Sequence, residues 1–142
     1  MAAGVLTFAF SAIYQQALID FFKSFGFPPA RGPSVGEPRI VTLSDYAFWV
    51  VASVVVAPLG EELFFRGYAL AGLARKGKQN VALILSSLLF AAVHLNPVGF
   101  VPLFFAGMIL GTVFLRTGSL TASIAAHATN NLIVTTLTYL GY

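Results

Sequence analysis

The decapeptide PLGEELFFRG, residues 58–67, places two adjacent carboxylates and an arginine directly behind an apolar run that begins at Tyr46. In a helix, Glu62 and Arg66 are four residues apart and share a face, so this spacing predicts an ion pair. Glu61 is rotated about 100° from Glu62 and has no cation at that spacing. One carboxylate is therefore expected to be neutralised locally and the other to be available for chemistry. The alternative is a helix-end salt bridge at a membrane interface.

Composition indicates the class of protein. Hydrophobic residues make up 58% of the 142 residues and charged residues 9%, whereas soluble domains carry about 25% charged residues. This predicts an integral membrane protein with the lipid bilayer as its surroundings. A net charge of +3, without a basic run interleaved with aromatics, argues against nucleic acid as a partner. The lack of cysteine excludes disulfides, thiolate metal sites and a cysteine nucleophile.

The apolar pattern predicts an all-α fold, a polytopic membrane helix bundle that forms a single domain over residues 1–142. About five hydrophobic segments are expected, at residues 2–22, 45–75, 81–95, 100–115 and 119–140. The second segment is longer than a bilayer core of about 30 Å requires. Pro58 and Gly60 within it predict a kink or break just before the charged motif.

Residues 23–44 differ from the apolar segments on either side. They contain four prolines and a mixture of charges. Proline-rich and glycine-rich stretches of this kind are typical of exposed connections. We therefore expect residues 23–44 to form an exposed loop.

Polar side chains recur inside the later segments. His94 follows Phe90 by one helical turn, and Asn131 follows His127 by the same interval. A lone intramembrane histidine or asparagine is more often a hydrogen-bonding contact between helices than a catalyst. Together with Glu61, however, these residues come from three separate segments, and polar groups in lipid seek one another. A shared buried cluster is therefore predicted.

Such a cluster suits amide hydrolysis. A carboxylate and an imidazole can hold a water and remove its proton, while a second imidazole and a carboxamide can stabilise an oxyanion. Other protease chemistries fit less well, because H-E-x-x-H and G-x-S-x-G are absent and Asp20 and Asp45 lie at segment ends. The serines on the helices are interpreted as small packing residues: Ser86, Ser87, Ser119 and Ser123.

Two histidines and a glutamate are also a ligand set of catalytic zinc sites. Histidine ligands are usually oriented by an acceptor on the other ring nitrogen. Apart from Glu62, which Arg66 is expected to occupy, no acidic residue lies within the segments to serve as that acceptor. The sequence therefore favours a site without a metal or other cofactor. The alternative is zinc bound by Glu61, His94 and His127.

Three motifs occur in a fixed order: E-E-x-x-x-R at residues 61–66, F-x-x-x-H at 90–94 and H-x-x-x-N at 127–131. Together they resemble the CPBP family of CAAX protease, bacteriocin-processing or Abi-type membrane proteins, with a family core at about residues 49–134. The resemblance implies a multi-pass endopeptidase of a prokaryotic cell membrane, related to the type II CAAX prenyl protease. Its implied substrate is a membrane-associated protein or peptide, either of CAAX type or with a peptide leader.

The resemblance also assigns roles to residues. It implies that Glu61 and His94 activate the water, while His127 and Asn131 stabilise the oxyanion. The implied supporting residues are Glu62, Arg66 and Phe90. Family members often have more than five membrane helices, so the chain is expected to be a minimal member or a fragment.

Some relatives resemble bacteriocin-immunity or partner-binding membrane proteins, in which the same polar cluster would serve binding without catalysis. This is the alternative to the hydrolase. Replacement of Glu61 by Gln separates the two, because it would abolish proteolysis and leave a binding role mostly intact.

Overall fold

The computed structural model describes residues 2–26, 40, 42–75, 77–96 and 99–141, and within them the secondary structure is entirely helical. The predicted all-α fold is confirmed. Four of the helices are unbroken α-helices: α1 (Ala2–Ser24), α5 (Gln79–Val93), α6 (Phe100–Thr117) and α7 (Leu120–Tyr139). A further long helix runs from Leu43 to Ala74. Most of the predicted exposed loop, residues 27–39 and 41, lies outside the described residues.

The long helix changes register instead of breaking. It consists of α2 (Leu43–Val50), the π-helical stretch η1 (Val51–Val56), α3 (Ala57–Glu62), the π-helical stretch η2 (Leu63–Leu70) and α4 (Ala71–Ala74). Of the predicted kink or break at Pro58 and Gly60, the break is therefore wrong, and the kink stays a prediction. A proline ring clashes with the carbonyl four residues back in an α-helix. A π-helical turn just before Pro58 widens the helix at that point, which explains how the chain stays helical there.

Local signals set the helix ends. Thr42 caps α2 by accepting the Asp45 N–H, while the Asp45 carboxylate accepts the Thr42 N–H, a complete capping box. Gly118 ends α6 at φ +64°, a left-handed conformation that favours glycine. Ser119 then caps α7. This tight turn places α7 immediately after α6 in the bundle.

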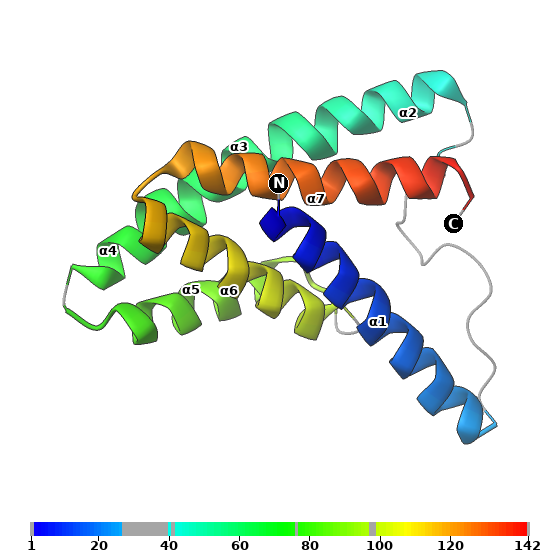
Figure 1. Cartoon of the computed structure of the whole chain (residues 1–142), viewed down its shortest axis with the longest axis horizontal. Helices are drawn as coiled ribbons and strands as arrows, with labels where there is room; N and C mark the ends of the chain where they lie inside the picture. The colour runs from blue at the N-terminus through cyan, green and yellow to red at the C-terminus, as the bar shows by residue number, and fades with distance from the viewer. Residues whose placement is uncertain (1, 27–39, 41, 76, 97–98, 142) are drawn as a thin grey trace.

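Helices α5 and α6 pack side by side, and α7 lies along the long helix, as Figure 1 shows. α1 crosses the bundle against α6 and α7. Helices α5 and α6 approach each other closely at Gly107, where a Cβ atom would lie 3.0 Å from the Ser87 Cα. Small residues at such crossings let helix backbones come close together in membranes.

The bundle buries charged side chains as well as apolar ones in its core. Arg66 and Glu62 are 1% and 0% exposed, while many large apolar side chains on the helices are exposed. Two helices among the described residues, Leu43–Ala74 and Phe100–Thr117, are long and apolar enough to cross a membrane, and α5 is a shorter apolar helix. The other predicted membrane spans remain predictions.

Candidate active site

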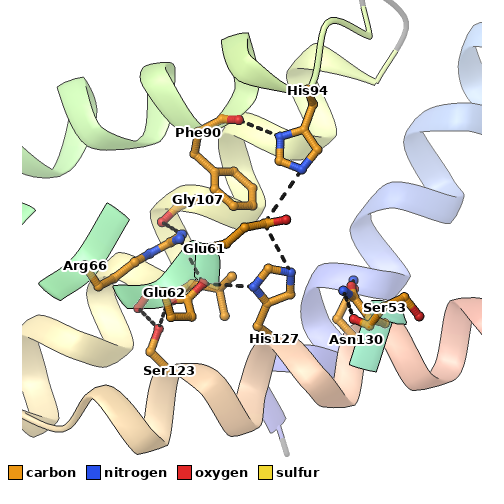
Figure 2. Close-up of polar contacts among 12 residues, drawn as sticks. Ser53, Glu61, Glu62, Arg66, Phe90, His94, Gly107, Ser123, His127 and Asn130 are labelled. Atoms are coloured by element: carbon orange, nitrogen blue, oxygen red, sulfur yellow. Dashed lines mark hydrogen bonds and ion pairs between the residues drawn. The ribbon is translucent and has the colours of Figure 1, made fainter. Parts of the chain in front are cut away.

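Glu61 and the two histidines come together beside the bundle core, where the side chains of Glu61 and His94 are 29% and 28% exposed and only that of His127, at 7%, is buried. The Glu61 Oε2 atom lies 3.8 Å from His94 Nε2 and 3.8 Å from His127 Nε2. Glu61 comes from α3, His94 is the residue that ends α5, and His127 comes from α7. Figure 2 shows both rings pointing their Nε2 atoms at the carboxylate. The predicted convergence of these three residues is therefore present.

The position of His94 is set by Phe90, one turn earlier on α5. The His94 Nδ1 atom lies 2.6 Å from the Phe90 backbone carbonyl oxygen. The two rings are also in contact, with centroids 4.7 Å apart. Because a carbonyl oxygen only accepts hydrogen bonds, Nδ1 must carry a hydrogen. In the neutral ring, Nε2 then presents a lone pair to Glu61.

His127 has the same arrangement with a different acceptor. Its Nδ1 atom lies 2.9 Å from the Glu62 Oε1 atom. A carboxylate accepts, so Nδ1 donates and the neutral ring again presents the Nε2 lone pair. Three acceptor atoms thus face one another: Glu61 Oε2, His94 Nε2 and His127 Nε2. Within the described part of the chain, Glu61 Oε2 has no hydrogen-bond partner. Such a group of acceptors is satisfied by a water that donates hydrogen bonds, by an added proton, or by a cation.

Glu62 is the centre of the supporting network. Its Oε1 atom accepts from Arg66 Nη1 at 2.9 Å, so the predicted ion pair is present. Its Oε2 atom accepts from Ser123 Oγ at 2.5 Å. The Arg66 Nη2 atom also donates to the Gly107 carbonyl at 3.2 Å. Arg66 Cζ lies 4.7 Å from the centroid of the Phe90 ring, in cation–π contact.

Asn131 is oriented by two neighbours. Its Nδ2 atom donates to the Ser53 backbone carbonyl at 2.7 Å, and its Oδ1 atom accepts from Asn130 Nδ2 at 3.0 Å. The amide nitrogen has two hydrogens, and the bond to Ser53 uses only one. The other hydrogen can serve an oxyanion. Asn131 and Asn130 both line the cavity described next.

A cavity of about 230 Å³ opens at this site. Its lining combines the polar cluster with an apolar wall from α6: Glu61, Phe90, His94, Leu103, Ala106, Leu110, His127, Asn130 and Asn131. A water occupies about 30 Å³ of liquid. The volume of the cavity is therefore several times that of the single water that Glu61 and the histidines would hold. It has room for a reacting water together with part of a substrate.

The order and spacing of these residues fit a known family. The sequence pattern of the type II CAAX prenyl endopeptidase Rce1-like family matches residues 43–133, more than half of the chain. The chain belongs to this Rce1-like family. The resemblance read from the three motifs is thereby confirmed. No curated protein and no solved structure was found to match the chain.

Membership of the Rce1-like family, together with the apolar helices, identifies an integral membrane protein and supports a CAAX-type intramembrane protease. The implied substrate is a membrane-associated peptide or protein. The matched range contains every candidate residue of the site and excludes α1.

Two residues of the candidate site were not identified from the sequence. Ser123 was interpreted as a packing residue, yet it hydrogen-bonds the Glu62 carboxylate. Its position four residues before His127 was the available signal, since that spacing puts both side chains on one face of a helix. Asn130 was passed over beside Asn131, although it holds the Asn131 amide oxygen.

The argument against zinc in the sequence relied on a shortage of acceptors for the histidines. That premise is wrong, because the Phe90 carbonyl and Glu62 occupy the two Nδ1 atoms, as oriented metal ligands require. The donor set therefore fits zinc chemically. Tetrahedral zinc ligands lie about 3.3–3.5 Å apart, whereas the separations here are 3.8 Å. Accordingly, no three acidic or histidine side chains among the described residues are grouped closely enough to hold a metal.

Proposed function

We propose that this chain hydrolyses a peptide bond of a membrane-associated substrate, with a water activated by Glu61 and His94 and without a resident metal. The observation that supports this proposal most is the convergence of three acceptor atoms beside a cavity: Glu61 Oε2, His94 Nε2 and His127 Nε2. The substrate is a CAAX-type tail or a peptide leader. The setting is a multi-pass protein of a prokaryotic cell membrane.

The separation of Glu61 and His94 suits a shared water. With 3.8 Å between the two acceptors, one water oxygen can lie about 2.8 Å from both. That water donates one hydrogen to each, which leaves its lone pairs free to attack a substrate carbonyl. As the oxygen–carbon bond forms, the water's proton passes to Glu61. When the carbon–nitrogen bond breaks, Glu61 returns this proton to the leaving amine.

The oxyanion requires hydrogen-bond donors on the opposite side of the carbonyl. Asn131 offers its second amide hydrogen, because the first is used on Ser53. His127 uses its Nδ1 hydrogen on Glu62, so its Nε2 donates only when the ring is protonated. Glu62 is balanced by Arg66, whereas Glu61 is not. If the substrate complex binds a proton on His127, its Nε2 would change from an acceptor to the second oxyanion donor.

The alternative cofactor is zinc, bound by Glu61, His94 and His127. Such an ion would act as a Lewis acid toward the substrate carbonyl. The residues keep their supporting contacts under either assignment, because Glu62 and Phe90 hold the Nδ1 atoms in both cases. Whether the protein binds zinc therefore has to be measured separately from whether it hydrolyses peptides.

The test of function uses purified protein in lipid nanodiscs. Prenylated CAAX peptides and unprenylated leader peptides are incubated with the wild type and with Glu61→Gln, and products are identified by mass spectrometry. Cleavage by the wild type that Glu61→Gln abolishes supports the proposal. A wild type that binds such peptides but cleaves none supports the partner-binding alternative.

A further inference from the structure

Pro58 lies where the helix changes from π-helical to α-helical hydrogen bonding. The Ala57 N–H, one residue earlier, donates to the Ala52 carbonyl, five residues back. Continuation of this register would pair the N–H of residue 58 with the carbonyl of Ser53. Proline has no N–H. The Ser53 carbonyl is thus deprived of its donor within the helix.

This carbonyl receives its hydrogen bond from another helix. Asn131 of α7 donates to it through Nδ2 at 2.7 Å. Buried backbone carbonyls are nearly always paired, so the carbonyl left free by Pro58 accounts for the presence of this contact. The carbonyl only accepts, which fixes the Asn131 amide with its nitrogen toward Ser53 and its oxygen toward Asn130.

We infer that Pro58 is a positioning residue. By withholding a backbone donor from the Ser53 carbonyl, it fixes the amide that supplies an oxyanion hydrogen from Asn131. The inference rests on the proposed function for the role of Asn131. The hydrogen-bond relation between Pro58, Ser53 and Asn131 is independent of that function.

The first test is Pro58→Ala, which restores an N–H that competes with Asn131 for the Ser53 carbonyl. Loss of one oxyanion donor lowers kcat by about a hundredfold or more. Partial misorientation of Asn131 should lower kcat by about tenfold, with KM nearly unchanged. Thermal stability should be retained or increased, since alanine is a much better helix former than proline. A merely structural role for Pro58 predicts the opposite, with stability and activity falling together, and that result would overturn the inference.

Pro102→Ala is the matched control. Pro102 lies in the first turn of α6, where the first helical bond is made by the Leu103 N–H to the Gly99 carbonyl. An N–H at residue 102 therefore has no helical carbonyl to capture. The kcat of Pro102→Ala should therefore stay within about twofold of the wild-type value. A tenfold loss in this variant as well would show that the effect of Pro58→Ala is not specific.

The second test is a double-mutant cycle with Asn131→Ala, measured in both kcat and Tm. When Asn131 is already alanine, Pro58→Ala should change kcat by less than twofold. Asn131→Ala should lower Tm in the wild type and much less in Pro58→Ala, where a backbone donor replaces the lost amide. Additive effects in the Tm cycle contradict the inference. If the wild type cleaves no peptide, the proposed function fails, and the Tm cycle still decides whether Pro58 creates the Asn131 contact.

Discussion

His127 donates its Nδ1 hydrogen to the Glu62 Oε1 atom across 2.9 Å. This bond joins the supporting ion pair to the candidate catalytic group, because the same Oε1 atom accepts from Arg66. It also fixes which ring nitrogen of His127 faces Glu61. Glu62 is therefore more than a partner for Arg66, because it also holds the His127 ring in one tautomer.

Arg66→Ala should reduce folded yield as well as activity. Arg66 is 1% exposed, and its loss leaves the Glu62 carboxylate buried without its cation. Breaking a buried pair of this kind costs about 3–5 kcal/mol. The measurement is thermal unfolding in detergent. Lys23→Ala is the control, because Lys23 forms an exposed ion pair with Asp20 at 3.8 Å and exposed pairs contribute about 0–1 kcal/mol. Equal stability of Arg66→Ala and the wild type would show that the buried pair is not structural.

Ser123→Ala should lower both stability and kcat. It removes the hydroxyl that donates to Glu62 Oε2, and an unsatisfied buried acceptor costs about 1–3 kcal/mol. Ser87→Ala is a control of equal burial, because the Ser87 hydroxyl donates to the Leu83 carbonyl of its own helix and not to the Glu62 carboxylate. The control should keep kcat. An unchanged Tm and kcat in Ser123→Ala would remove Ser123 from the site.

Gly107→Ala should be more damaging than Gly111→Ala. At Gly107 the new Cβ would meet the Cα and Cβ atoms of Ser87 at 3.0 Å, so α5 and α6 have to separate. At Gly111 the nearest atom is the tip of the Leu83 side chain, which can rotate away. The Gly107 carbonyl also accepts from Arg66. We expect a loss of about 1–3 kcal/mol at Gly107. A larger loss at Gly111 in denaturation experiments would contradict the helix crossing described here.

Metal analysis decides between the two cofactor assignments. The metal-free proposal predicts active enzyme with less than about a tenth of a zinc per chain and activity that resists chelators. Stoichiometric zinc that restores activity after stripping would overturn it and make His94 and His127 ligands. The measurement is elemental analysis of the same nanodisc sample whose peptidase activity is assayed, before and after chelation.

The sequence predicted the contacts that follow from spacing on one helix. The Glu62–Arg66 pair is local, and the helical arrangement of the chain follows from its apolar segments. The meeting of Glu61, His94 and His127 was predicted by a different argument, because polar groups in lipid gather. Family resemblance added roles that spacing alone left open.

The individual hydrogen bonds between helices could not be predicted from the sequence. The face that α7 turns toward α3 depends on packing, so the bonds from Ser123 and His127 to Glu62 could not be read from spacing. The π-helical stretches have no simple apolar period, and Pro58 therefore suggested a break where the helix continues. Because the π-helical stretches were not predicted, the hydrogen bond between Asn131 and the Ser53 carbonyl was not predicted either.

The central claim is that a water held by Glu61 attacks a peptide bond. It is tested most directly by incubating the wild type and Glu61→Gln with a cleavable peptide in ¹⁸O-labelled water. The account predicts one heavy oxygen in the new carboxyl terminus for the wild type, and a rate at least about a thousandfold lower for a folded Glu61→Gln. Cleavage by Glu61→Gln at the rate of the wild type would contradict the account.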